Sequence, residues 1–120
     1  MGEEKTAYVD LEERTFLFAK RCRDFVKKLP KTISNIEYGK QLIRSSGSVA
    51  ANYIEANEAI SKKDFYHRIK ISRKEAKESR LWLRLVGPSE EQKKEQEELI
   101  QEALELTKIF ASIANKQDNT

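Results

Sequence analysis

The chain is predicted to fold as an all-α protein, an antiparallel up-down-up-down four-helix bundle, on three observations. Apolar residues recur at steps of three and four along four separate stretches, which is the period of an α-helix. Turn-forming residues divide these stretches at Pro30, Ser61 and the Gly87–Pro88 pair. No stretch alternates polar and apolar residues as a strand does. Short turns favour neighbouring helices that run in opposite directions, and we expect residues 1–120 to form one domain.

Composition indicates long helices that are largely exposed to solvent. Hydrophobic residues make up 38% of the chain and charged residues 36%. A single chain of this kind has a thin core, because each amphipathic helix contributes only one apolar stripe. We therefore expect it to associate with further copies of itself. No apolar run resembles a signal peptide or a membrane span, so we expect a cytoplasmic protein with no membrane contact.

The first helix is expected over about residues 10–29. Asp10 and Glu13 form a capping pair at its start, and residues 1–9 are expected to be frayed. Pro30 ends the helix. Cys22 is the only cysteine, which excludes an intrachain disulfide, and its place on the apolar stripe predicts a buried side chain. The stripe consists of Leu11, Thr15, Phe18, Cys22, Phe25 and Leu29.

The second helix, over about residues 35–59, carries apolar and small residues on two stripes. We expect it to be buried on more than one side and to be the most central element. Gly39 and Gly47 each cost about 1 kcal/mol relative to alanine, so we expect another helix to approach them closely. One stripe consists of Ile36, Ile43, Gly47, Ala50 and Ile54, and the other of Leu42, Val49, Tyr53, Ala56 and Ile60.

A row of polar residues lies between these two stripes. It is either a surface strip or a hydrogen-bond network at a buried contact, and we favour the network, since buried polar groups need partners. Glu75 and Glu78 of the next helix are the expected partners of Arg44. The row consists of Arg44, Ser48, Asn52 and Glu55.

The third helix, over about residues 62–86, begins at a capping signature formed by Ser61 and Asp64, and Gly87 with Pro88 ends it. Its apolar and small seam consists of Phe65, Ile69, Ser72, Ala76, Ser79, Leu83 and Val86. Five cations at steps of three and four share one flank of this helix. We call them the basic stripe: Lys70, Arg73, Lys77, Arg80 and Arg84.

The fourth helix is expected over about residues 89–114, opened by Ser89 with Gln92 and followed by a polar tail. Charge is segregated between the last two helices. Residues 62–84 hold nine Lys or Arg against three Asp or Glu, whereas residues 89–116 hold four against seven. The seam of the fourth helix consists of Leu99, Ala103, Leu106, Phe110 and Ile113.

Catalytic chemistry has little support, and we expect no enzyme activity, no cofactor and no metal site. His67 is the only histidine, sits beside Arg68 on a charged helix and has no obvious acid or base partner for a catalytic pair. Glu75 and Glu78 resemble half of a di-iron helix pair, but the Glu-x-x-His partners of such a site are missing. A metal site needs a cluster of ligands, and the sequence offers none at the required spacing.

Residues 44–65 read RSSGSVAANYIEANEAISKKDF. This segment resembles the signature of the bacterial family of proteins encoded in 23S rRNA intervening sequences, also called an S23 ribosomal protein family. The likeness extends over about residues 10–110. The matching positions are Arg44, Ser45, Ser48, Asn52 and Glu55, followed by Ser61, Lys62, Lys63, Asp64 and Phe65.

The resemblance implies an antiparallel four-helix bundle that assembles as a ring, a homopentamer. The family is similar in fold to the accessory variability protein of diversity-generating retroelements. That relative partners a reverse transcriptase and binds nucleic acid through a basic surface.

Two functions of different classes are open, and we favour the first. In the first, the basic stripe binds the phosphates of structured RNA or other nucleic acid, and Lys20, Arg23 and Lys27 of the first helix are its expected neighbours. Aromatic residues for base stacking are few, which favours duplex or structured RNA over single strands. In the second, the chain is a protein-interaction scaffold without nucleic-acid contact, such as a reverse-transcriptase accessory. Its basic third helix then meets the acidic fourth helix of its own or another copy.

Overall fold

The computed structural model describes the backbone of residues 2–119 and the side chains of residues 11–117. Within this part of the chain there are four α-helices and no strand, which confirms the all-α prediction. α1 begins at Gly2, ahead of the predicted start at Asp10, so the prediction that residues 1–9 are frayed is wrong for residues 2–9, whose backbone is helical. The predicted Asp10–Glu13 cap depends on the side chain of Asp10, which lies outside the described side chains. The helices are α1 (Gly2–Lys27), α2 (Ile33–Asn57), α3 (Lys62–Leu85) and α4 (Lys93–Asn115), with 3-10 helices η1 (Glu90–Gln92) and η2 (Lys116–Asn119) at either end of α4.

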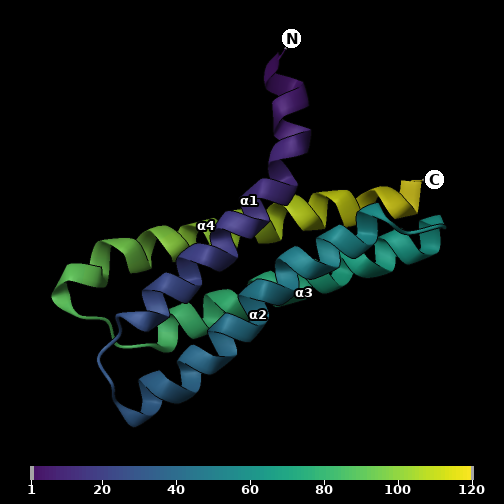
Figure 1. Cartoon of the computed structure of the whole chain (residues 1–120). Helices are drawn as coiled ribbons and strands as arrows, with labels where there is room; N and C mark the ends of the chain where they lie inside the picture. The colour runs from purple at the N-terminus through teal and green to yellow at the C-terminus, as the bar shows by residue number, and fades with distance from the viewer. Residues whose placement is uncertain (1, 120) are drawn as a thin grey trace.

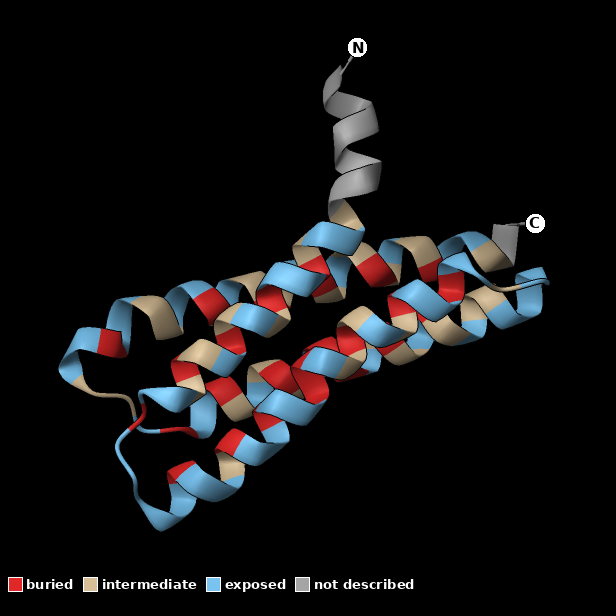
Figure 2. Ribbon diagram, viewed as in Figure 1, coloured by how far each residue is buried: buried red, intermediate tan, exposed pale blue. Residues whose placement is uncertain are grey.

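Each helix packs on two neighbours around one core (Figure 1). α2 lies against α1 and α3, and α4 lies against α3 and α1, so α1 and α3 face each other diagonally across the core. Buried residues line the inward sides of all four helices (Figure 2). The predicted seams of α1, α3 and α4 are buried, apart from half-buried Leu11, Phe65 and Ile113. The large side chains at the centre are Phe18, Phe25, Leu42, Ile69, Leu83, Leu99, Leu106 and Phe110.

Hydrogen bonds between side chains and backbone amides cap the N-terminal ends of α2, α3 and η1. Thr32 Oγ1 accepts from the Asn35 amide at 3.1 Å, which caps α2. Ser61 Oγ accepts from the Asp64 amide at 3.1 Å, as predicted for α3. The Ser89 amide donates to Gln92 Oε1 at 3.3 Å, which completes the predicted capping box ahead of α4.

Gly87 follows the end of α3 but does not act as a left-handed helix cap, because no glycine among the described residues has a positive φ. Its amide instead donates to Asn35 Oδ1 at 2.8 Å. The Asn35 side chain also donates to the carbonyls of Pro30 and Gly87, both at 2.9 Å. A buried asparagine therefore ties the turn before α2 to the turn after α3.

Small residues let α2 approach its neighbours closely. Ser45 Oγ and Ser79 Oγ lie 2.8 Å apart in the core between α2 and α3, and Ser72 Oγ donates to the Val49 carbonyl at 3.1 Å. A Cβ atom on Gly39 would lie 2.8 Å from Cγ1 of Val26, so the predicted close approach at Gly39 is confirmed, and the partner is α1.

The prediction that both stripes of α2 are buried is wrong for a single chain. The stripe with Leu42 and Val49 lies in the core, except for Ile60, which is 96% exposed beyond the end of α2 at Asn57. On the other stripe, Ile36, Ile43 and Ile54 are 44–46% exposed. Nothing lies within 4 Å of a Cβ atom placed on Gly47. The two stripes lie about a third of a turn apart on α2, and α1 and α3 together cover only one of them.

Candidate nucleic-acid interface

The basic stripe lies along the flank of α3 that adjoins α4. Lys70, Lys77 and Arg84 are exposed, and Arg73 and Arg80 are half-buried. Among the described residues, none of the five cations forms an ion pair with a carboxylate. The stripe is therefore a row of positive charge that the described part of the chain does not neutralise.

Four acidic side chains of α4, Glu95, Glu98, Glu102 and Glu105, pair with arginines of α1. Arg14 donates from Nε to Glu102 Oε2 at 2.7 Å and from Nη2 to Glu102 Oε1 at 2.8 Å, and it also reaches Glu105 at 2.9 Å. Arg21 pairs with Glu98 at 3.0 Å and more weakly with Glu95 at 3.5 Å. The expected meeting of basic α3 with acidic α4 inside one copy is thus not found among the described residues.

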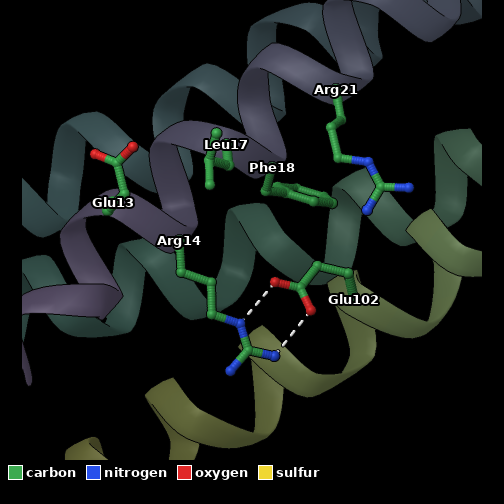
Figure 3. A pocket seen from close by; sticks show the side chains of 6 residues that line it. All are labelled: Glu13, Arg14, Leu17, Phe18, Arg21 and Glu102. Carbon is green, nitrogen blue, oxygen red and sulfur yellow. Dashed lines mark hydrogen bonds and ion pairs between the residues drawn. The ribbon is translucent and has the colours of Figure 1, made fainter. Parts of the chain in front are cut away.

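These ion pairs border a groove of about 410 Å³ between α1 and α4. Figure 3 shows Arg14 extended toward Glu102, with Phe18 and Arg21 beside it. The hydrogen bond to Glu102 is the main reason that the pKa of Arg14 lies above its ordinary value. A hydrogen bond from Gln101, followed by the one from Arg14, lowers the pKa of Glu105. The groove's arginines are thus already occupied by carboxylates.

Arg80 is the most constrained member of the basic stripe. Its Nε atom is buried and has no hydrogen-bond partner. A buried charged donor without an acceptor costs free energy, so Arg80 gains if its side chain turns outward to an acceptor such as a phosphate oxygen.

The cations of α1 do not extend the basic stripe in a single chain. Lys20, Arg23 and Lys27 are exposed on the side of α1 that points away from the core, and α1 lies diagonally across from α3. Arg23 also pairs with Asp24 at 3.0 Å. The expectation that these three residues neighbour the stripe is therefore wrong within one copy.

The predicted polar network exists as two separate clusters. Arg44 Nη2 lies 3.2 Å from Glu78 Oε1 and 3.4 Å from Glu75 Oε1, so both predicted partners are present. The Glu75 contact is an ion pair only, because the buried Oε1 atom makes no hydrogen bond. Arg44 and Glu78 lie at the surface, so this cluster is only partly buried.

The second cluster joins Ser48 and Asn52 to a residue that the sequence analysis missed. Asn52 Nδ2 donates to Ser48 Oγ at 2.9 Å, and Arg68 Nη1 donates to Asn52 Oδ1 at 3.0 Å. Arg68 lies seven residues before Glu75 on the same flank of α3, and this spacing is the signal that could have identified it. Glu55 is exposed and takes no part in either cluster.

Other kinds of site find no support in the described part of the chain. No group of three or more His, Cys, Asp or Glu residues there could hold a metal ion, and His67 is exposed. None of the described helices combines the length and the apolar character needed to cross a membrane. Cys22 is buried, and desolvation raises its pKa to about 12 from an ordinary value of 9.0, which favours the protonated thiol over the nucleophilic thiolate.

Comparison with known proteins agrees with the signature on α2 and α3. The family model described as 23S rRNA-intervening sequence protein matches residues 9–112. The crystal structure of a protein of unknown function from the S23 ribosomal protein family of Bacteroides thetaiotaomicron VPI-5482 is similar, with a TM-score of 0.75 and 33% sequence identity. That match covers 86% of this chain and 96% of the other. Comparison with curated proteins gives no match. The chain belongs to the family of 23S rRNA-intervening sequence proteins.

Proposed function

We propose that this protein is a non-enzymatic, oligomeric, cytoplasmic helical-bundle protein that binds structured RNA or other nucleic acid through the basic stripe of α3. One observation carries the proposal: among the described residues, none of the five cations of the stripe has an acidic partner. Four carboxylates of α4 instead form ion pairs with Arg14 and Arg21 of α1. A row of unneutralised cations attracts a polyanion, because each phosphate contact releases condensed counterions.

Structured RNA or duplex fits the stripe better than a single strand. From Lys70 to Arg84 the stripe extends about 21 Å along the helix axis at 1.5 Å per residue, which allows several phosphate contacts in a row. Base stacking needs accessible aromatic rings. The rings of α3 are already engaged, since Trp82 stacks on Tyr38 at 5.8 Å and Tyr66 contacts Phe65 at 5.1 Å. We therefore expect weak sequence preference and a steep dependence on salt.

The proposal includes an antiparallel up-down-up-down bundle and a ring of copies. Contacts between α2 and α3 support the first part, because their residue numbers run in opposite directions: Asn35 with Gly87, Ser45 with Ser79, and Asn52 with Arg68. The family resemblance supports five copies. Repeating the stripe around a ring multiplies its contacts with one nucleic acid and raises the overall affinity.

A charge-matched pair of variants tests the stripe. Arg73→Gln with Lys77→Gln and Arg80→Gln removes three charges from α3, and Lys20→Gln with Arg23→Gln and Lys27→Gln removes three from α1. Each lost phosphate contact lowers the slope of log K against log salt by about 0.9 on duplex, so the α3 variant should lose about 3 units of slope. The α1 variant should lose little. Circular dichroism controls for folding, and equal losses in both variants would show a general charge effect that contradicts the proposal.

The second candidate function is a protein-interaction scaffold, such as a reverse-transcriptase accessory, without direct nucleic-acid contact. The observation that favours it is the exposed apolar side of α2, with Ile36, Ile43 and Ile54 open to solvent. The two candidates differ in one result, because a scaffold does not bind nucleic acid even at low salt.

A further inference from the structure

Three buried polar atoms in the described side chains have no hydrogen-bond partner, and all three lie on α3. The carboxylate of Glu75 has the charge of Arg44 at 3.4 Å, and Trp82 is uncharged. Arg80 is different, because it is charged and its Nε atom has neither a hydrogen bond nor an ion pair within the described part of the chain. A buried donor of this kind costs free energy and is rare in folded proteins, so its presence needs an explanation.

The side of α4 that adjoins α3 carries no carboxylate to pair with Arg80. Gln96 identifies this side, because its Nε2 atom donates to the carbonyls of Leu83 and Val86 at 2.9 and 3.3 Å. The side continues at helical steps of four, seven and four through Gln96, Ile100, Thr107 and Ala111. The carboxylates of α4 that form ion pairs reach α1 instead. An acceptor for Arg80 therefore has to come from outside the described part of the chain.

Another arginine of this chain shows which kind of acceptor satisfies an Nε atom. Arg14 donates to the two carboxylate oxygens of Glu102 from Nε at 2.7 Å and from Nη2 at 2.8 Å. A phosphate group offers the same pair of oxygens to the planar guanidinium. Lysine has a single compact ammonium group and cannot form this two-point contact. Lys77 and Arg84 lie on either side of Arg80 along the basic stripe and add attraction for an anion.

We propose that Arg80 anchors nucleic acid on the basic stripe, by turning outward and binding one phosphate through both Nε and Nη2. The inference rests on the proposed function and adds which cation contributes most and why it must be a guanidinium. The phosphate supplies an acceptor that Arg80 lacks in the free protein. The exposed cations Lys70, Lys77 and Arg84 are hydrated before binding, so they gain less from the same contact.

Arg80→Lys tests the anchor because it keeps the charge and removes the fork. Fluorescence anisotropy with a labelled RNA duplex at several salt concentrations measures the affinity and its salt slope. The variant should bind about tenfold more weakly, since it loses one of two hydrogen bonds to a charged group, and the slope should not change. Arg84→Lys, on the exposed part of the stripe, should lose less. Arg23→Lys on the outward side of α1 is the control and should bind as wild type does.

Arg80→Met adds a readout on the free protein. Methionine matches arginine in helix propensity and has no buried donor, so the melting temperature without nucleic acid should rise. Arg84→Met also removes one like charge from the stripe, and its melting temperature should rise less, because Arg84 is exposed. Affinity for the duplex should fall in Arg80→Met. Stability and affinity therefore move in opposite directions, which a purely structural role for Arg80 does not produce.

The results separate the anchor from the proposed function. Steep, salt-dependent binding by wild type that Arg80→Lys and Arg84→Lys weaken equally would overturn the anchor and leave the basic stripe as the interface. A lower melting temperature in Arg80→Met would show that the side chain serves the fold, which also overturns the anchor. A wild type that does not bind the duplex even at low salt would refute the proposed function, and the inference with it.

Discussion

Among substitutions of a single polar residue by alanine, Asn35→Ala should destabilise the bundle most. Asn35 is only 4% exposed and joins two turns that lie far apart in the sequence. Its Nδ2 atom donates to the carbonyls of Pro30 and Gly87 at 2.9 Å, and its Oδ1 atom accepts from the Gly87 amide at 2.8 Å. Alanine removes all three hydrogen bonds and leaves their backbone partners near the protein interior.

The expected loss follows from these contacts. A hydrogen bond contributes about 1 kcal/mol net, so three contribute about 3 kcal/mol. Alanine recovers up to about 0.7 kcal/mol through its higher helix propensity. The free energy of unfolding should therefore fall by about 2–3 kcal/mol. For a chain of this size that corresponds to a drop of roughly 10 °C in melting temperature.

Urea unfolding followed by circular dichroism at one fixed protein concentration measures this loss. Asn57→Ala is the control, since Asn57 is exposed on the same helix and should change stability by less than about 0.5 kcal/mol. Asn35→Asp retains the acceptor for the Gly87 amide but places a buried carboxylate oxygen against the carbonyls of Pro30 and Gly87, so it should be at least as unstable as Asn35→Ala. A loss in Asn35→Ala no larger than that in Asn57→Ala would refute the reasoning.

The remaining predictions concern the packing and the charges of the core helices. Cys22 should resist thiol reagents at pH 8 until the chain unfolds. Because its folded pKa of about 12 lies above the ordinary 9.0, the free energy of unfolding should fall as pH rises from 9 toward 12, by up to about 1.4 kcal/mol per pH unit. Urea titrations of Cys22→Ala should lack this dependence on pH. Glu102→Gln should cost about 1 kcal/mol at low salt and less at high salt, and salt-independent destabilisation would argue against the Arg14 ion pair as its cause. Gly39→Ala should destabilise the wild type, since its methyl group meets Val26, but should stabilise a Val26→Ala background by about 1 kcal/mol; the same sign in both backgrounds would contradict the close approach.

The helical period predicted most of the fold because it reports which residues of a helix share a face. The seams around Phe18, Ile69 and Leu106 are all buried, and the Ser61 cap is present. The period does not report which neighbour a face meets. For that reason the sequence did not show that Glu102 turns to Arg14 on α1, or that Lys20 and its neighbours lie away from the basic stripe.

Two features could not be predicted from one chain's sequence for different reasons. The partners of Asn35 are backbone groups, one of them 52 positions away, and backbone groups leave no side-chain pattern in the sequence. The stripe of α2 with Ile36, Ile43 and Ile54 has the same spacing as a core seam, so periodicity alone cannot distinguish a buried side of this helix from an exposed one.

Fluorescence anisotropy with labelled structured RNA, duplex DNA and single-stranded DNA, each titrated at low and near-physiological salt, tests the central claim most directly. The account predicts micromolar or tighter binding to structured RNA or duplex at low salt, a steep fall in affinity as salt rises, and weaker binding to the single strand. Absence of binding to all three probes at low salt would contradict the claim that the unpaired cations of α3 form a nucleic-acid interface.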